Sequence, residues 1–228
     1  MPANAPAAEN LQALQRRIAD SARAAGRDPS TIQLLAVSKR QSADAVRALA
    51  TTGQRAFGEN YVQEALGKQA ALGDLALDWH FIGRLQRNKT REVAARFAWV
   101  HTVDRLDLAE RLSRQRPAEL APLNVLLEVN VSGEDTKGGI PPVAVPALAE
   151  AVRPLPGLVL RGLMCLPEPT PDIARQRAAF RLLRETLAAL PGPPLDTLSM
   201  GTTGDFEAAI AEGATIVRIG TALFGARD

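Results

Sequence analysis

The sequence predicts a single α/β domain folded as a closed (β/α)8 barrel, also called a TIM barrel. Eight short apolar or β-branched runs alternate with segments of helical length along the 228 residues. Strict alternation of this kind is typical of parallel strands joined by helical crossovers, and no linker or low-complexity tract interrupts it. An open, doubly wound sheet remains the alternative, because a sequence does not show whether a sheet closes.

A helix is expected before the first strand. Leu11, Leu14 and Ile18 recur at helical spacing, and Gly26 follows where a helix often ends. We therefore expect an extra N-terminal helix on the barrel. Residues 1–8 are expected to form a flexible tail, and residues 9–228 the barrel domain.

The remaining elements follow one another in the order that a barrel requires. The predicted strands are rich in aliphatic and aromatic residues and cover residues 32–38, 55–60, 78–83, 99–103, 123–131, 158–166, 196–201 and 215–220. The predicted helices are amphipathic and cover residues 42–53, 61–72, 88–98, 105–115, 142–153, 172–190 and 204–213. Proline-rich stretches at 141–146 and 190–196 are interpreted as loops or helix starts, so no domain boundary is expected.

The composition restricts the classes of function. Twenty-seven basic and 25 acidic residues give a formal net charge of +2, which is too small to steer nucleic acid or to grip an acidic membrane. The single cysteine, Cys165, excludes an intramolecular disulfide and a multi-cysteine metal cage, and it fits a reducing compartment. The sequence shows neither a leader pattern nor an apolar stretch of about 20 residues. We therefore expect a cytoplasmic protein that binds neither nucleic acid nor membrane.

Lys39 directly follows the apolar run LLAVS of the first predicted strand. Functional groups of (β/α)8 barrels come from the C-terminal ends of the strands and from the loops that follow them. In a partly dry pocket, desolvation lowers the pKa of an amine and leaves it nucleophilic toward a carbonyl. A lysine whose stem only covers the barrel rim is the alternative, and Lys39 alone does not decide between the two.

Two turns rich in glycine and threonine follow the last two predicted strands. The segments LSMGTTGDFEAAIAEG and TIVRIGTALFG each run from a strand through a turn toward a helix, and both offer backbone N–H groups and hydroxyls. Barrels often bind phosphate at this position, so Ser199, Thr202, Thr203 and Thr221 are candidates for a phosphate site. Ordinary helix capping by the same hydroxyls is the alternative for each turn taken alone.

Arg218 is the one charged residue of the predicted last strand, residues 215–220. Both faces of a strand in a parallel barrel are covered, so a guanidinium there needs a partner. A salt bridge and a hydrogen bond to a ligand in the barrel mouth are the two alternatives. A lysine amine, a phosphate site and an arginine directed at a ring nitrogen are together the features that a pyridoxal phosphate site requires.

Other candidates have less support. A metal pair of His80 and His101 is disfavoured because no carboxylate or cysteine cluster is near, and His80 reaching the barrel mouth is the alternative. Lys137 is interpreted as a solvated loop lysine, or else as a second amine that captures or hands over an aldehyde. The basic stretch at residues 83–91 lacks interleaved aromatic residues and is poor evidence for nucleic-acid binding, although it leaves the docking of a partner protein open.

The sequence resembles the YggS/PROSC family of pyridoxal phosphate homeostasis proteins, which are similar to the N-terminal barrel of alanine racemase. The motifs that carry the resemblance arrive in the family's order through nearly the whole chain: LLAVSK, FGENYVQEA, WHFIGRLQRNK, VHTVDR, LLEVNVSGEDTKGGI, LRGLMCLP, LSMG and VRIGTALFG. The resemblance implies a single-domain barrel that binds pyridoxal 5'-phosphate and takes part in the intracellular homeostasis of this cofactor.

The resemblance also implies roles for individual residues. Lys39 would hold pyridoxal phosphate as an internal aldimine, and Arg218 would face its pyridine nitrogen. The other residues that it places around the cofactor are Asn60 beside the ring, Met200 near it, and Ser199, Gly220 and Thr221 at the phosphate.

The turn after LSMG departs from the family pattern. Thr202 and Thr203 stand where the family usually has methionine and serine, and Gly204 replaces an acidic or polar residue. Thr203 keeps the hydroxyl of the serine, so a phosphate contact by Thr203 is still implied.

A carrier is favoured over an enzyme. An arginine opposite the pyridine nitrogen offers no acceptor for a pyridinium proton, so the ring would be a weak electron sink. Racemisation also needs an acid or base on the opposite ring face, which alanine racemase takes as a tyrosine from a separate domain, whereas Tyr61 is the only tyrosine here. We therefore expect no catalytic residue and a monomer that buffers the cofactor or delivers it to apo-enzymes.

Two enzymatic alternatives remain. A pyridoxal-phosphate-dependent amino-acid racemase or decarboxylase would use the same cofactor site and would also turn over amino acids. A Schiff-base aldolase acting on phosphosugars would share the lysine and the phosphate site but would not need Arg218.

Overall fold

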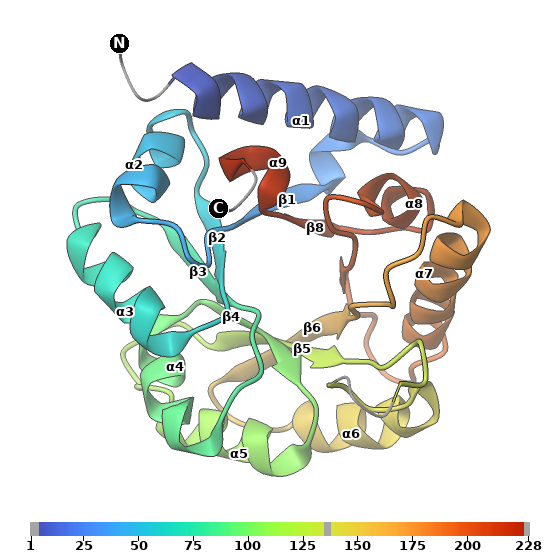
Figure 1. Ribbon diagram of the computed structural model, residues 1–228. Coiled ribbons are helices and arrows are strands. Elements are labelled where there is room, and N and C mark those ends of the chain that lie inside the picture. The colour runs from blue at the N-terminus through green and yellow to red at the C-terminus, as the bar shows by residue number, and fades with distance from the viewer. Residues whose placement is uncertain (1–4, 135–137, 226–228) are drawn as a thin grey trace.

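The computed structural model is a closed barrel of parallel strands enclosed by helices (Figure 1). It describes residues 5–134 and 138–225. The strands are ordered in the barrel as they are in the chain, and the first also pairs with the eighth, so that the sheet has no free edge. The predicted (β/α)8 barrel is confirmed, and the open doubly wound alternative is excluded.

Every observed strand lies within the run that the sequence predicts for it. The strands are β1 (Gln33–Val37), β2 (Ala56–Glu59), β3 (Asp78–Phe81), β4 (Trp99–Val103), β5 (Leu123–Glu128), β6 (Leu158–Met164), β7 (Thr197–Ser199) and β8 (Ile216–Ile219). Several strands end before the predicted run does. The residues beyond these ends belong to the loops at the C-terminal side of the barrel, where sequence patterns alone do not separate strand from loop.

The helices alternate with the strands as predicted. They are α1 (Ala5–Ala24), α2 (Ala43–Thr51), α3 (Val62–Ala71), α4 (Thr90–Arg96), α5 (Leu106–Gln115), α6 (Val145–Val152), α7 (Ile173–Ala188), α8 (Phe206–Ala211) and α9 (Thr221–Phe224). Short 3-10 turns are η1 (Pro29–Thr31), η2 (Arg87–Lys89) and η3 (Pro142–Ala144). Two of these helices have N-terminal capping side chains. The Ser42 hydroxyl accepts from Ala45 N at 3.1 Å at the start of α2, and the Asp172 carboxylate accepts from Ala174 N at 2.8 Å at the start of α7.

Helix α1 lies across the outside of the barrel next to α8 and α9 (Figure 1). Leu11, Leu14 and Ile18 are buried, which is the face that the sequence pattern predicts. Arg17 adds an ion pair to Glu207 of α8 at 2.5 Å. The helix begins at Ala5, before the expected boundary at residue 9. Its contacts with α8 and α9 place α1 on the part of the barrel where the last strand, β8, pairs with the first, β1.

A chain of polar side chains crosses the barrel interior. His80 Nδ1 lies 2.9 Å from His101 Nε2, and His101 Nδ1 lies 2.9 Å from Ser199 Oγ. Arg218 NH1 donates to the same Ser199 Oγ at 2.8 Å, and all four side chains are buried. Since β4 and β7 are not neighbours in the sheet, the bond between His101 and Ser199 must cross the interior.

The two histidines are hydrogen-bonded to each other inside the barrel. Burial lowers the pKa of His80 to about 3, and burial also lowers the pKa of His101 well below its usual value, so both rings are neutral at physiological pH. Among residues 5–134 and 138–225, no group of three or more histidine, cysteine, aspartate or glutamate side chains is arranged to hold a metal ion. His80 also stacks on Trp99, with ring centroids 5.3 Å apart.

The pairing of β6 with β7 depends on a glycine. Gly162 pairs with Thr197, and a Cβ added at Gly162 would lie 1.8 Å from the Thr197 carbonyl oxygen. We expect Gly162→Ala to lower the free energy of unfolding by about 3 kcal/mol or more, because the strand must move to admit the methyl group. Urea unfolding checks this result. Gly67→Ala is the matched control, since an added Cβ meets nothing within 4 Å there, and it should be neutral or slightly stabilising in helix α3. Equal effects of the two substitutions would contradict the expectation.

The buried His80 predicts an acid-dependent stability. An unfolded histidine takes up a proton near pH 6.5, whereas folded His80 resists protonation down to about pH 3, so the unfolded state binds more protons between these values and stability falls as the pH falls. We expect His80→Gln to flatten this fall by about 1 kcal/mol per pH unit between about pH 6 and pH 4. Denaturant titrations of both proteins at several pH values measure the slopes. Parallel curves would show that His80 does not carry the effect.

Candidate functional site

A cavity of about 270 Å³ opens at the C-terminal end of the barrel. It is lined by residues at or just after the ends of six strands, namely Val37, Lys39, Asn60, Ile82, Leu166, Thr202, Thr203, Arg218, Gly220 and Thr221. Six of the eight residues that the resemblance places around a cofactor are among them: Lys39, Asn60, Thr203, Arg218, Gly220 and Thr221. The structure thus brings together residues that are up to 182 positions apart in the chain.

Lys39 stands on a tight turn that follows β1. Ser38 N donates to Gly58 O at 3.0 Å, which continues the pairing of β1 with β2, and Gln41 N then donates back to Ser38 O at 3.0 Å. Lys39 is half-buried within this turn and lines the cavity. The backbone of Arg40, with φ of 62°, lies in the left-handed region, which a residue with a side chain seldom adopts.

Asn60 lines the cavity from the loop after β2. A Cβ added at Gly83 would lie 2.1 Å from the Asn60 carbonyl oxygen, so only glycine lets the loop after β3 approach Asn60 this closely. The side-chain Oδ1 of Asn60 is buried and has no hydrogen-bond partner in the part of the chain that the structure describes. A buried acceptor without a hydrogen-bond partner lowers the stability of the fold unless a ligand or a water molecule donates to it.

The turn after β7 carries the threonines of the cavity. Asp205 Oδ1 accepts from Thr202 N at 2.6 Å and from Thr202 Oγ1 at 2.9 Å, which fixes the turn that presents Thr203. Gly201, with φ of 92°, lets the turn pass close to Ala209 of α8. On the other side, Thr221 lines the cavity from the turn after β8.

The dipoles of helices α8 and α9 contribute little to anion binding at this site. Helices α8 and α9 have only six and four residues, so few peptide dipoles are aligned behind either turn. Hydroxyls and free backbone N–H groups of the two turns are therefore the groups that can hold an anion there.

Ser199 and Met200 lie behind the cavity and do not line it. The Ser199 hydroxyl is fully buried and is engaged with Arg218 and His101, although the resemblance assigns it to a phosphate. Met200 is fully buried in the hydrophobic core. Through these bonds Ser199 contacts Arg218 and helps to fix its orientation.

Arg218 is held by uncharged oxygens. NH1 donates to Ser199 O at 2.6 Å and to Ser199 Oγ at 2.8 Å, and NH2 donates to Cys165 O at 2.8 Å. These bonds use three of the five guanidinium donors, and Arg218 also lines the cavity. Burial lowers the pKa of Arg218, and burial raises the pKa of the neighbouring Cys165 thiol to about 12, so the thiol stays protonated.

Glu128 is a group near the barrel mouth that the sequence analysis missed. It is the last residue of β5, and burial raises its pKa to about 7, with a further increase from Asp104 and opposing effects from Arg218 and Arg84. A carboxylate directly after the apolar run VLL of the predicted strand is the signal that was available, since it resembles the position of Lys39 after LLAVS. Glu128 gives the surroundings of Arg218 a charge that changes near neutral pH.

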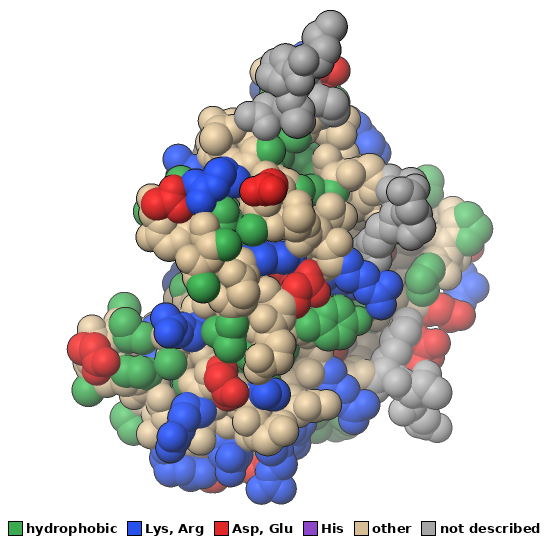
Figure 2. Space-filling model, turned by 60° about the vertical axis from the view of Figure 1, so that its left-hand side comes forward, with side chains coloured by type: hydrophobic (Ala, Val, Ile, Leu, Met, Phe, Trp, Pro, Cys, Tyr) green, Lys and Arg blue, Asp and Glu red, His purple; other side chains and the backbone are tan. Residues whose placement is uncertain are grey.

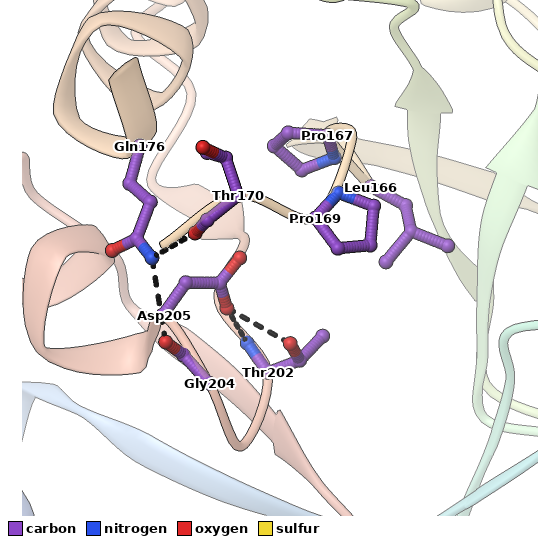
Figure 3. Close-up of a pocket in the computed structure, with 8 residues that line it drawn as sticks. All are labelled: Leu166, Pro167, Pro169, Thr170, Gln176, Thr202, Gly204 and Asp205. Carbon is purple, nitrogen blue, oxygen red and sulfur yellow. Dashed lines mark hydrogen bonds between the residues drawn. The ribbon is translucent and has the colours of Figure 1, made fainter. Parts of the chain in front are cut away.

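A second cavity of about 250 Å³ adjoins the first (Figure 3). The two share Leu166 and Thr202, and the other residues that line the second one are Pro167, Pro169, Thr170, Gln176, Gly204 and Asp205. Gln176 Nε2 of α7 donates to Thr170 O at 2.7 Å and to Gly204 O at 3.5 Å (Figure 3). This amide ties the loop after β6 to the turn that carries Thr203.

The basic stretch of the sequence, residues 83–91, does not line the cavity, although Gly83 packs against Asn60, which does. The basic stretch at residues 83–91 reaches η2 and α4, where Arg87 pairs with Asp107 at 3.3 Å and Lys89 with Glu92 at 3.7 Å. Figure 2 shows such mixing of basic and acidic side chains over much of one face of the molecule. Lys137 lies outside the described residues. Within those residues, no helix combines the length and the apolar character that a membrane span needs.

Comparison with known proteins identifies the family. Residues 10–228 match the family described as alanine racemase, N-terminal domain. A pyridoxal phosphate homeostasis protein from Pseudomonas aeruginosa is 64% identical over 221 residues, covering 97% of this chain and 96% of that protein. The protein of the same name from Escherichia coli is 51% identical and covers 97% of both chains.

Solved structures agree with this assignment. PipY of Synechococcus elongatus, solved with pyridoxal phosphate bound, superposes with a TM-score of 0.83 at 38% identity and covers 96% of this chain and all of its own. Alanine racemase from Corynebacterium glutamicum shares the fold alone, with a TM-score of 0.66 at 16% identity over 95% of this chain and 62% of its own. The chain therefore belongs to the alanine racemase N-terminal domain family and, within it, to the pyridoxal phosphate homeostasis proteins.

Proposed function

We propose that this protein binds pyridoxal 5'-phosphate in the cavity at the barrel mouth and serves the homeostasis of that cofactor by holding it reversibly. The observation that carries the proposal is that one cavity unites an amine from the end of β1, an arginine from β8 and the hydroxyls of two turns. These are the groups that an aldehyde, a pyridine nitrogen and a phosphate require. The names of the relatives support the same function.

The residues of the cavity fit the cofactor on two further points. The orphaned Oδ1 of Asn60 is a buried acceptor that a donor on the ring would satisfy. Arg218 lines the cavity, and a guanidinium can only donate, so its match is the lone pair of an unprotonated ring nitrogen.

Individual residues take distinct parts in this binding. Pyridoxal phosphate, when bound, supplies an aldehyde that condenses reversibly with a lysine amine. Lys39 provides that amine, while Thr203, Gly220 and Thr221 hold the phosphate. Ser199 acts indirectly, because its hydroxyl and carbonyl oxygens accept from Arg218 and fix the orientation of the guanidinium.

We propose a carrier and not an enzyme. An arginine at the ring nitrogen cannot accept the proton that a strong electron sink carries, which disfavours chemistry through a carbanion. Tyr61 is 50% exposed at the start of α3, as expected for a surface residue and not for an enclosed acid or base. The proposed role is that of a monomer in the cytoplasm that buffers the cofactor and supplies apo-enzymes that depend on it.

Lys39→Ala should abolish covalent binding. We expect the purified variant, mixed with pyridoxal phosphate, to lose the near-visible absorption band of the lysine-bound cofactor and to yield no adduct after borohydride reduction. Lys89→Ala is the matched control, because Lys89 is a partly exposed lysine paired with Glu92 away from the cavity. Peptide mapping by mass spectrometry locates the adduct in the wild type. An adduct that persists in Lys39→Ala would refute the assignment of Lys39.

The carrier role predicts no turnover of amino acids. We expect the loaded protein, incubated in deuterated water with a panel of L- and D-amino acids, to exchange no α-proton above the rate of free pyridoxal phosphate. Proton NMR measures this exchange, and alanine racemase serves as the positive control. Exchange or loss of carbon dioxide above the free-cofactor rate would favour the racemase or decarboxylase alternative. Trapping of a sugar phosphate by borohydride would favour the aldolase.

A further inference from the structure

A buried ionic cluster lies between helix α3 and the ends of β1 and β2. Lys68 of α3 is only 5% exposed, and its ammonium donates to Glu59 Oε1 at 2.7 Å, to Glu64 Oε1 at 2.6 Å and to Ser38 O at 2.6 Å. The Ser38 hydroxyl also donates to Glu59 Oε1 at 2.6 Å. All three N–H groups of the ammonium are therefore used.

The cluster holds the peptide groups on both sides of Lys39. Lys68 binds the carbonyl oxygen of Ser38, which belongs to the peptide bond that precedes Lys39. Glu64 accepts from the backbone N–H of Arg40, which belongs to the peptide bond that follows it. The same ion pair thus fixes the backbone of Lys39 at both ends, and the direction in which its side chain leaves the turn follows from these two anchors.

The second anchor acts where the backbone is strained. Arg40 is the one residue other than glycine with a positive φ in the described part of the chain. This conformation costs about 1–2 kcal/mol for a residue with a Cβ, so it persists only where the surroundings impose it. The bond from Arg40 N to Glu64 is an interaction that imposes it here.

Stability alone does not explain the cluster. A buried ion pair seldom stabilises a protein more than apolar residues of the same volume, because desolvation offsets the attraction. Desolvation is unfavourable for the Glu59 carboxylate: burial raises its pKa, although the hydrogen bonds from Lys68 and Ser38 oppose this rise. The Oε2 atom of Glu59 also has no hydrogen-bond partner among the described residues. Lys68 itself is no candidate for the reactive amine, because carboxylates hold its ammonium and it does not line the cavity.

We propose that Lys68 and Glu64 are positioning residues for Lys39: their ion pair fixes the backbone on both sides of this lysine and so presents its amine to the aldehyde of the cofactor. The inference rests on the proposed function. In the step that it assists, a C=N bond would form between Lys39 Nζ and the aldehyde carbon, the C=O bond would break, and the oxygen would leave as water with the two hydrogens of the neutral amine.

Glu64→Ala is the variant of choice. Replacing Lys68 would leave two carboxylates facing each other in a buried site and could prevent folding, whereas Glu64 is partly exposed and Lys68 keeps Glu59 when Glu64 is removed. We expect Glu64→Ala to weaken covalent binding of pyridoxal phosphate, measured by its absorption band, about tenfold, which corresponds to a loss of ~1.4 kcal/mol. Binding of pyridoxine 5'-phosphate, which fills the same cavity but has no aldehyde, should stay unchanged.

Two further variants serve as controls. Glu64→Gln keeps an acceptor oxygen for Arg40 N and for Lys68 and should restore most of the covalent binding. Glu92→Ala removes a carboxylate from the first turn of α4 that pairs with Lys89, and it should have no effect.

The outcomes separate the inference from the function. Unchanged covalent binding in Glu64→Ala, or an equal loss for both ligands, would overturn the positioning role while leaving pyridoxal phosphate binding by the wild type intact. A wild-type protein that binds neither ligand would instead refute the proposed function and, with it, the inference.

Discussion

The pairing of β1 with β8 is the constraint on which the site depends. Leu35 lies opposite Arg218 and Ala36 opposite Ile219, so the first and the last strand run side by side although nearly the whole chain separates them. This pairing closes the barrel and brings the amine at the end of β1 beside the arginine and the turn of β8. Because the sheet has no edge, the relative position of these groups is as rigid as the backbone hydrogen bonds of the barrel.

Two layers of buried polar groups support the cavity from behind. On one side, Ser199, which is itself bonded to His101, holds Arg218 within the barrel, and burial keeps the histidines neutral so that Arg218 is the charged member of that chain. On the other side, Lys68 and its carboxylates hold the turn that carries Lys39. In both layers a charged side chain is held by several hydrogen bonds, three to Arg218 on one side and three to Lys68 on the other, so each layer fixes the orientation of the group that it supports.

The site residues differ in how far the sequence could predict them. Lys39 follows the end of an apolar strand and Arg218 lies within one, and a charge in either place needs a reason that pattern analysis can detect. Ser199 carries the same hydroxyl whether it faces a ligand or the barrel interior, so only the structure shows that it contacts Arg218. Lys68 lies in an ordinary amphipathic helix, and its burial depends on a loop thirty residues earlier in the chain.

The sequence by itself determined the order of strands and helices, and it predicted most of the residues that line the cavity at the C-terminal end of the barrel, because alternation of apolar runs and family motifs are local properties of the chain. Tertiary structure alone decided that the sheet closes and that two polar clusters lie beneath the cavity. These features depend on contacts between residues far apart in the chain, such as His101 with Ser199, and no local pattern encodes which distant side chains will meet.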